Sequence, residues 1–388
     1  MDPFDTIYPA DSTEFCPHPD ATDIFVCGTY KLEQPLSNVA EDTEDETSLA
    51  ARQSSPQKRT GRCLVFQVDS PEDLHLYVTS RTPDLLLTPE CSSQIQAIDM
   101  PAILDMKWCH TTQDRRPLLA IANAEGEVTL HEWDKDQKLL QQTGSIRCAP
   151  PDVLCLSLDW SNRRFPTSTM GSLVVSLSNG EVALLEPNPE TGLRLTDTWH
   201  AHDFEPWIAA WDYWDPDSIF SGGDDLKLKI WDKRQGFDTP TMVNKRFDAG
   251  ITTIQSHPHV EHIFAVGSYD STVRLYDRRK PLTPLTEADV SGGAWRVKWH
   301  PAPNRNHDLL VACMHDSFKI IKFRDIWEPG QPKTAAGQNW EIAQTFDKHE
   351  SLGYGVDWSF SPSNGSEPGN TLIASASFYD HALHLWKG

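Results

Sequence analysis

The chain has 388 residues and an acidic balance, with 56 Asp and Glu against 34 Lys and Arg and a formal net charge of −22. This charge argues against binding to a nucleic-acid backbone or an anionic membrane, because both need clustered basic residues. A hydrophobic share of 38% and 14 Trp supply ample material for a core. We therefore expect a folded protein that binds no nucleic acid and no membrane.

Motifs for metals, cofactors and targeting are missing from the sequence. The eight cysteines include no CxxC pair, which gives neither a zinc ligand set nor a disulfide framework. The acidic N-terminus lacks the apolar core of a signal peptide, and no stretch reaches the roughly 18 apolar residues that span a bilayer. The sequence contains no phosphate-binding loop, no HExxH, no dinucleotide fingerprint and no GxSxG. We predict a cytoplasmic protein without a cofactor or metal.

One phrase recurs along the chain: an apolar run, small residues, an acidic turn, and a strand that ends in an aromatic or apolar residue. The first copy is split, because residues 24–30 and 62–68 are its two predicted strands. Between them, residues 36–60 contain EDTEDET and are predicted to be a disordered acidic insertion. Six further copies follow at 118–134, 172–186, 219–232, 263–277, 309–323 and 372–386.

The spacing of these copies predicts the fold. Trp231 and Tyr276 are 45 residues apart, which is near the period of roughly 40 to 45 residues that is typical of WD40 repeats. Each copy also has a preceding strand that ends in a polar corner, as in LDWSN and VKWHP. We predict one all-β domain over residues 1–388, a seven-bladed WD40 β-propeller. The segment FDTIYPA, from Phe4, is expected to complete the last blade and close the ring.

Some polar residues of the repeat are predicted to be structural. In WD40 repeats a His, a Ser, an Asp and a Trp form a buried hydrogen-bonded chain. His202, Ser221, Asp225 and Trp231 fit that spacing. We expect the same structural role for the turn residues Asp270, Asp316 and Asp380.

Two other series are candidates for function. The residue before each turn acid lies outside the hydrogen-bonded chain, and this series holds Ala124, Ser178, Asp224, Tyr269, His315 and Tyr379. The loops that enter the innermost strands share the same rim, and they add Trp207, Thr252, Trp295 and Tyr354. Together the series predict a recognition site with an acid, a histidine and five aromatic rings, with Arg296 beside it. Two alternatives stay open: the rings cap the core between blades, or the site binds a peptide without chemistry.

The residue types at this rim suggest a chemistry. Aromatic faces with an acid nearby hold a quaternary ammonium group through the ring quadrupole and Coulomb attraction. A histidine with a pKa near neutrality can activate water.

Several phrases resemble a known family. The strings WIAAWDYW, SGGDDLKLKIWD, VGSYDSTVRLYDRR, GGAWRVKWHP, ACMHDSFKI, YGVDWS and SFYDHALHLW are similar to those of the diphthine methylesterase family, WD40 proteins of diphthamide biosynthesis. The resemblance is densest from about residue 200 onward. The first three blades match only in general pattern.

The resemblance implies an enzyme that hydrolyses the methyl ester of methylated diphthine on translation elongation factor 2 and releases methanol. On this hypothesis the trimethylammonium group of the substrate has Asp224 as its counter-charge. The aromatic cage is Trp207, Tyr269, Trp295, Tyr354 and Tyr379. His315 is the predicted base, with His381 as the alternative base, and Arg296 is predicted to stabilise the developing oxyanion.

A rival prediction is a scaffold without catalysis. The phrases WDKR and YDRR resemble the WDxR box with which some propellers dock on the adaptor of a cullin-type ubiquitin ligase. Arg234 and Arg279 would make that contact. The box is predicted on the rim opposite the aromatic residues, so the two functions are compatible.

Overall fold

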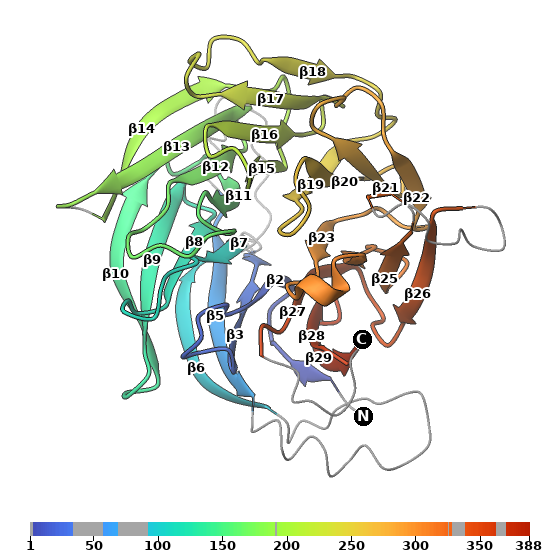
Figure 1. Ribbon diagram of the computed structural model, residues 1–388. Coiled ribbons are helices and arrows are strands. Elements are labelled where there is room, and N and C mark those ends of the chain that lie inside the picture. Colours follow the sequence, from blue (N-terminus) through green and yellow to red (C-terminus); the bar gives the residue numbers. More distant parts are fainter. Residues whose placement is uncertain are drawn as a thin grey trace, which may run out of the picture.

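The computed structural model describes residues 3–33, 57–68, 92–190, 192–324, 326–327, 338–361 and 370–388. These residues form seven antiparallel sheets that stand around a central axis, one sheet per blade (Figure 1). The fold confirms the predicted all-β, seven-bladed propeller. In blades 2 to 6 the strands run in chain order from the centre outward, so four successive strands a to d make one blade.

Blade 1 contains the split repeat. Its strands are β2 (Ala10–Phe15), β3 (Ile24–Thr29), β5 (Arg59–Val68) and β6 (Ser92–Pro101), and a short β4 (Lys31–Leu32) pairs with the start of β5. The strands predicted at 24–30 and 62–68 correspond to β3 and β5. Most of the acidic insertion predicted at 36–60 lies outside the described residues. Its last two residues belong to β5, so a strand begins there earlier than the sequence suggests.

Blades 2 to 4 follow the regular plan. Blade 2 is β7 (Ile103–Trp108), β8 (Leu118–Asn123), β9 (Glu127–Asp134) and β10 (Leu139–Arg147). Blade 3 is β11 (Cys155–Trp160), β12 (Leu173–Leu177), β13 (Glu181–Asn188) and β14 (Gly192–His200). Blade 4 is β15 (Ile208–Trp211), β16 (Ser218–Gly222), β17 (Leu228–Asp232) and β18 (Met242–Asn244).

Blades 5 to 7 complete the ring. Blade 5 is β19 (Ile251–Ser256), β20 (Ile263–Ser268), β21 (Thr272–Asp277) and β22 (Thr286–Asp289). Blade 6 is β23 (Arg296–Trp299), β24 (Asp308–Ala312), β25 (Phe318–Phe323) and β26 (Trp340–Phe346), with the 3-10 helix η2 (Pro303–Arg305) between its first two strands. Blade 7 takes β27 (Gly353–Trp358), β28 (Leu372–Ser377) and β29 (Ala382–Lys387) from the end of the chain.

The N-terminal segment closes the ring, as predicted. Strand β1 (Phe4–Asp5) pairs with β29 and becomes the outermost strand of blade 7. Thr6 adds two hydrogen bonds to the carbonyl of His381, at 2.9 Å from its N–H and 3.0 Å from its hydroxyl. The Phe4 ring also meets Phe66 of blade 1 edge-on, at 5.0 Å between centroids. The segment therefore links the last blade to the first and covers an edge that would otherwise be open.

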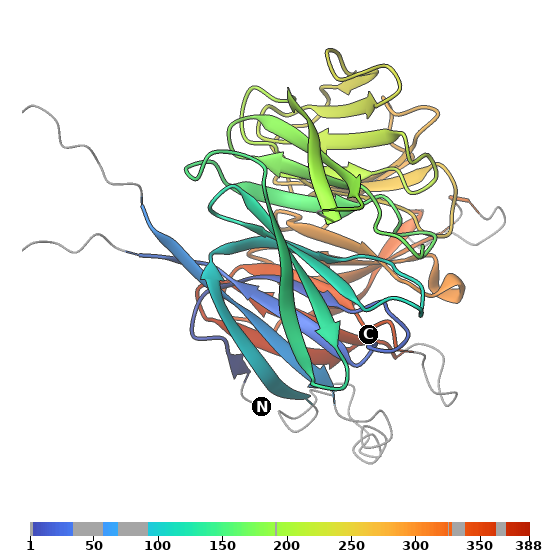
Figure 2. The ribbon, with the colours of Figure 1, turned by 90° about the vertical axis from the view of Figure 1, so that its left-hand side faces the viewer.

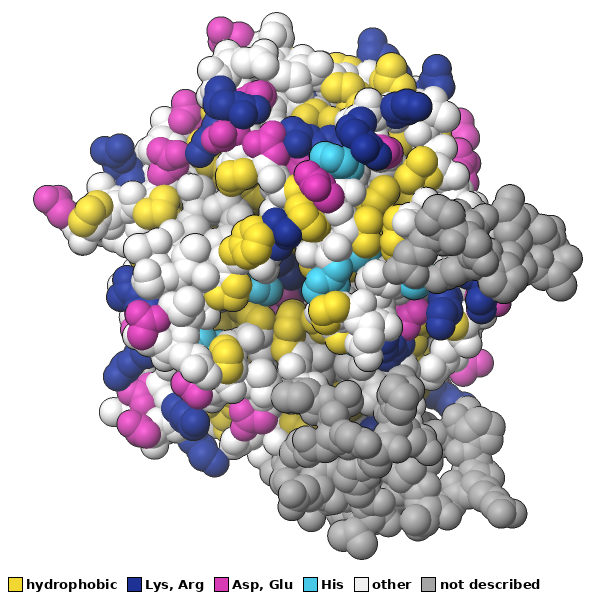
Figure 3. Space-filling view, in the orientation of Figure 1, with side chains coloured by type: hydrophobic (Ala, Val, Ile, Leu, Met, Phe, Trp, Pro, Cys, Tyr) yellow, Lys and Arg dark blue, Asp and Glu magenta, His cyan; other side chains and the backbone are white. Residues whose placement is uncertain are grey.

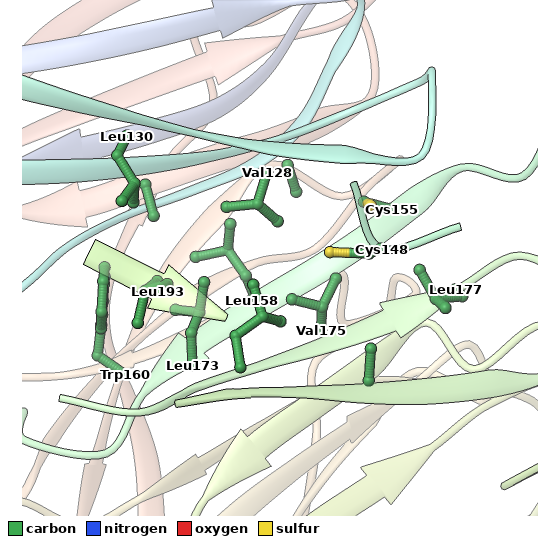
Figure 4. Packing of buried hydrophobic residues seen from close by; sticks show 14 of the residues in the cluster. Val128, Leu130, Cys148, Cys155, Leu158, Trp160, Leu173, Val175, Leu177 and Leu193 are labelled. Carbon is green, nitrogen blue, oxygen red and sulfur yellow. The ribbon is translucent and has the colours of Figure 1, made fainter. Parts of the chain in front are cut away.

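The core lies between neighbouring blades. Between blades 2 and 3, Val128 faces Leu158 and Val175, and Trp160 fills the space beside Leu173 (Figure 4). These side chains are fully buried, because alternating residues of each strand point toward the next blade. The apolar runs recognised in the sequence are this inter-blade packing.

The Trp that ends an innermost strand fixes one blade against the preceding one. The indole N–H of Trp160 donates to the carbonyl of Lys107 at 2.9 Å, and that of Trp358 donates to the carbonyl of Lys298 at 2.9 Å. Trp108 reaches back to the carbonyl of Glu14 in the same way. The recurring Trp of phrases such as MKW, LDW and VDW is thus a tie between blades. Among the described residues, no helix is long and apolar enough to cross a membrane.

Candidate functional site: the aromatic mouth

We use the name mouth for the rim that carries the b–c turns and the segments entering the innermost strands. In Figure 2 the β3, β4 and β5 hairpin of blade 1 extends toward this side, whereas η2 lies on the opposite side. The b–c turns share one conformation, because the residue after the turn acid has a positive φ, as in Leu226 (61°), Ser271 (64°) and His381 (57°). This left-handed residue makes the turn tight and sets the preceding residues in equivalent places.

The predicted hydrogen-bonded chain is present in blade 4. His202 contacts Asp225 at 2.8 Å through Nδ1 and Ser221 at 2.7 Å through Nε2, and the Trp231 indole donates to Ser221 at 2.8 Å. Burial raises the pKa of Asp225, but the hydrogen bond and charge of His202, the Asp203 N–H and the charge of Lys229 together lower it. Asp225 is therefore fully engaged in holding the blade.

The other turn acids have related but different partners. Asp380 accepts from Ser377 at 2.5 Å, Asp270 pairs with Arg274 at 2.8 Å, and Asp316 pairs with Lys319 at 2.5 Å. Their predicted structural role is supported by these contacts, although the full four-residue chain of blade 4 is not repeated at Asp270 or Asp316.

The predicted aromatic residues do come together. Trp295 is the centre of the group: Tyr354 stacks on it at 4.7 Å, Trp207 lies at 5.7 Å and Tyr269 at 6.0 Å between centroids. Trp207 and Tyr269 are inclined to Trp295 by 59° and 43°, so the three rings form a corner rather than a flat stack. Each is partly buried, as expected for a site that is lined by core-packed rings and open on one side.

Asp224 lies at this corner. A Cβ on Gly250 would stand 2.2 Å from Asp224 Oδ1 and 3.2 Å from Tyr269, so the carboxylate sits over Gly250 next to the Tyr269 ring. Burial raises the pKa of Asp224, and the nearby Trp207 indole partly offsets that rise. Together with burial, the Asp224 charge raises the pKa of Tyr269. Glycine at position 250 is what leaves room for the acid.

The mouth also contains a buried hydrogen-bond donor with no acceptor among the described residues. It is the indole N–H group of Trp295, and indoles outside the mouth, such as Trp211, share this condition. A buried N–H without an acceptor costs roughly 1–3 kcal/mol. The Trp295 donor at the mouth is thus suited to a ligand oxygen.

The rings of the mouth are set by a repeated irregularity of the innermost strands. The pairing of strand a with strand b shifts at Thr252 in blade 5 and at Tyr354 in blade 7, so these residues are bulged. A β-bulge re-aims the side chain of the extra residue. Trp207 and Trp295 come directly before β15 and β23 and hold the same place, four residues before the end of strand a.

Arg296 lies just inside the mouth on β23. Its side chain is buried, and its guanidinium stands 3.4 Å from the carboxylate of Asp105. Deeper along the axis, Lys298 pairs with Asp357 at 3.3 Å and Lys107 pairs with Glu14 at 2.8 Å. Burial raises the pKa of Glu14, but its lysine partners override burial and lower the pKa to about 2.

Beneath Arg296 the axis is almost filled. A cavity of about 20 Å³ remains among residues that include Lys107, Asp159 and Arg296. Such a space holds no more than one or two waters. Charged side chains therefore form the floor of the mouth, and we use the name well for the stretch of the axis between this floor and the aromatic group.

The remaining predicted site residues are placed less centrally. Tyr379 is 70% exposed and touches Phe378 at 5.0 Å, not Trp295. His315 is exposed in the b–c turn of blade 6, and His381 holds Thr6 through its carbonyl. Among the described residues, neither imidazole makes a ring contact or hydrogen bond with the aromatic group. Their predicted roles stay predictions.

Two aromatic members of the mouth were not predicted. Phe378 lies between Tyr354 (5.2 Å) and Tyr379, and Tyr30 of blade 1 lies 6.2 Å from Phe378. The signal for Phe378 was its place directly before Tyr379. The signal for Tyr30 was the aromatic end of the phrase IFVCGTY.

The opposite rim carries the predicted docking arginines. Arg234 and Arg279 follow strands β17 and β21, and each binds the Asp two residues before it, at 2.7 Å to Asp232 and 2.6 Å to Asp277. Figure 3 shows the rim that bears η2, where hydrophobic, histidine and some basic side chains gather around the centre and most charged side chains lie farther out. Docking on a ligase adaptor stays a prediction. No group of three or more His, Cys, Asp or Glu within the described residues could hold a metal ion.

The fold is that of a WD40 β-propeller, and one rim carries the aromatic group. Residues 242–277 match the family model for the WD domain, G-beta repeat. A chain of the structure titled "Crystal Structure of Mitotic Checkpoint Complex" is similar over 99% of this chain and 93% of that one, with a TM-score of 0.63. Its sequence identity is 14%, so this likeness concerns the fold alone.

Sequence relatives specify the family. The chain is 38% identical over 362 residues to diphthine methyltransferase of Mus musculus, covering 92% of this chain and 68% of the relative. It is 36% identical over 364 residues to that of Homo sapiens, covering 92% and 74%. The homolog in Dictyostelium discoideum is 32% identical over 394 residues, covering 98% and 96%. The chain belongs to the diphthine methyltransferase family, as the phrases indicated, and is an enzyme of diphthamide biosynthesis.

Proposed function

We propose that this protein hydrolyses the methyl ester of methylated diphthine on translation elongation factor 2, releasing methanol and leaving diphthine. The observation that carries the proposal is the corner formed by Trp207, Tyr269 and Trp295 with the Asp224 carboxylate beside it. Methylated diphthine has a trimethylammonium group, and aromatic faces with a nearby acid suit such a cation.

The geometry refines how the rings would hold this cation. Tyr354 stacks directly on Trp295 at 4.7 Å, so no group fits between these two rings. The cation would rest on the inclined faces of Trp207, Trp295 and Tyr269, with Tyr354 supporting Trp295 from behind. Tyr379 is separated from Trp295 by Phe378 and Tyr354, so it would touch the substrate only farther out on the rim.

The ester would then lie deeper in the well, near Arg296. The Arg296 guanidinium is buried in a region of low dielectric constant. It would stabilise the negative charge that develops on the carbonyl oxygen of the ester. The unpaired indole N–H group of Trp295 is a further donor near this place. His315 on the rim is the base predicted from the sequence, with His381 as its alternative.

The relatives are named for methyl transfer, whereas ester hydrolysis transfers the acyl group to water. The test therefore incubates the purified protein with elongation factor 2 that carries the methyl ester, with and without an added methyl donor. We expect loss of the methyl group by intact-mass measurement and an equal amount of methanol, both independent of the donor. A mass change that requires the donor, or no mass change at all, would reject the proposal; the latter result favours a scaffold.

A control isolates the recognition step. Trp207→Ala should weaken binding of a trimethylammonium ligand, whereas Trp214→Ala changes an indole on the opposite rim and should leave binding unchanged. Trp214 donates to the carbonyl of His257 at 2.8 Å, away from the mouth. Equal loss in both variants would mean that the mouth is not the cation site.

A further inference from the structure

Asp11 occupies the mouth position of blade 1. It lies four residues before Phe15, the end of β2, just as Trp295 and Tyr354 lie four residues before the ends of β23 and β27. The pairing of β2 with β3 shifts at Asp11, which is therefore bulged like Tyr354. The bulge directs its side chain toward the axis with the aromatic ring residues. The split repeat of blade 1 concealed this equivalence in the sequence.

The carboxyl group of Asp11 is buried and has no strong partner. The residue is 6% exposed, and no described residue donates a hydrogen bond to its side chain. Arg296 on β23 attracts it and Asp105 on β7 repels it. Its charge also acts on the phenols of Tyr269 and Tyr354, two rings of the aromatic group.

This environment sets the protonation of Asp11. Burial and the charge of Asp105 outweigh Arg296 and raise its pKa to about 7. The other titratable groups around it are the two phenols and the thiol of Cys27 on β3. Burial raises the pKa of Tyr354 to about 12 and that of Cys27 to about 12, so these groups stay neutral. A carboxyl that titrates near the working pH can both take and return a proton.

We propose that Asp11 is the general base of the mouth. The assignment rests on the proposed esterase function and replaces His315 in that role. Asp11 lies on the same level of the well as the aromatic corner and one residue level above Arg296, whereas His315 is exposed on the rim. An ester carbonyl placed near Arg296 would therefore be within reach of both Asp11 and Arg296.

The step balances as follows. The Asp11 carboxylate takes a proton from a water molecule as the water oxygen bonds to the ester carbonyl carbon, and the carbonyl becomes an oxyanion next to Arg296. The intermediate then collapses and the bond from carbon to the methoxy oxygen breaks. Asp11 returns its proton to the methoxy oxygen, so methanol leaves. The new carboxylic acid loses its proton to solvent.

The test uses the full chain with Asp11→Asn, which keeps the size and removes the base. We expect the turnover rate to fall about 100-fold or more, with unchanged affinity for a trimethylammonium ligand. The wild-type rate should rise with pH through a midpoint near 7, and the variant should lose this rise. Asp11→Glu, which keeps a carboxylate, should retain part of the rate.

The matched control is Asp289→Asn. Asp289 ends β22 on the same rim, is exposed, and only accepts a hydrogen bond from the Ser291 N–H at 2.8 Å. Its substitution removes one negative charge from the rim and should leave the rate and its pH profile unchanged. A second readout needs no substrate: potentiometric titration should show that wild type binds one proton near pH 7 that Asp11→Asn does not bind.

The outcomes separate the two proposals. If wild type releases no methanol, the proposed function fails, whatever the titration shows. If wild type hydrolyses the ester and folded Asp11→Asn keeps its rate and pH profile, the assignment of Asp11 is overturned and hydrolysis stands. Equal rate losses in Asp11→Asn and Asp289→Asn would also overturn it, because the effect would then be general electrostatics.

Discussion

The neighbouring residues Asp224 and Asp225 offer a direct test of which polar residues are structural. We predict that Asp225→Ala destabilises the propeller, whereas Asp224→Ala does not. The change at both positions is the same and the backbone is the same turn. Only the contacts differ.

The magnitude follows from those contacts. Asp225→Ala leaves His202, which is fully buried, without its partner at 2.8 Å, and it removes acceptors for the backbone N–H groups of Asp203 and Lys227. An unsatisfied buried donor costs roughly 1–3 kcal/mol, and each lost hydrogen bond about 1 kcal/mol. We expect a loss of about 3 kcal/mol, or about 4 °C in Tm for a chain of this length.

The assay is denaturant unfolding followed by Trp fluorescence, repeated between pH 7 and pH 3. The pKa of Asp225 is lowered in the folded state, so its stabilising effect is present above its ordinary value of 3.8 and is lost as the pH falls below that value. The difference in free energy of unfolding between wild type and Asp225→Ala should therefore become smaller in acid. For Asp224→Ala we expect a change within about 0.5 kcal/mol at pH 7, as for other exposed sites.

Two results would refute this reasoning. Equal destabilisation by the two substitutions would mean that the turn tolerates no change at either acid. If the loss of unfolding free energy in Asp225→Ala does not depend on pH, the charge of Asp225 does not stabilise the blade.

Three further predictions concern closure, recognition and the floor of the well. Deletion of residues 1–9 should lower Tm, and a normal melting curve for the deletion would contradict ring closure by β1. Phe4→Ala should lower the free energy of unfolding by about 1 kcal/mol, because it loses the aromatic contact with Phe66. Trp295→Ala should weaken tetramethylammonium binding by tenfold or more in calorimetry, and Trp295→Phe by less, whereas equal affinities would remove Trp295 from the site. Glu14→Gln should cost about 3 kcal/mol at pH 7, because the buried Lys107 and Lys298 each lose one of their two carboxylate partners. Since the pKa of Glu14 is lowered to about 2, the difference in free energy of unfolding between wild type and Glu14→Gln should disappear as the pH falls from 4.5 toward 2. A difference that stays constant in acid would contradict the conclusion that the Glu14 charge stabilises the fold.

The fold could be predicted because its signals are local and repeated. A strand, a polar turn and a second strand that ends in an aromatic or apolar residue recur in six uninterrupted copies, and each copy supplies two neighbouring strands of one sheet. Ring closure by β1 could be predicted because the last blade has only three strands at the end of the sequence and needs a fourth strand from another segment. The start of β5 at Arg59 was less predictable, because the strand begins before the recognisable part of the repeat and pairs there with β4.

The mouth could be predicted only where the repeat was clear. The series that gave Trp207, Trp295 and Tyr354 relies on aligning the ends of innermost strands, which works in blades 4 to 7. Asp11 belongs to the same series, but β2 carries Phe15 where the other blades carry Trp or Ser, so no phrase marked it. The stacking of Tyr354 on Trp295 depends on side-chain rotamers and not on spacing, so the sequence could not show that these two faces are closed.

The joining of blades 1 and 7 has a consequence for the order of assembly. A ribosome makes Phe4 and Asp5 before the six blades that separate them in sequence from their partners in β29. Blade 7 can be completed only when both segments are available, so Phe4 and Asp5 must wait unpaired while six blades are made. Asp11 follows this waiting segment on β2, which pairs with β3 of blade 1. A propeller that has failed to close would leave β2 without the packing of β27 and β28 against it, and on the proposed role of Asp11 activity would report complete assembly.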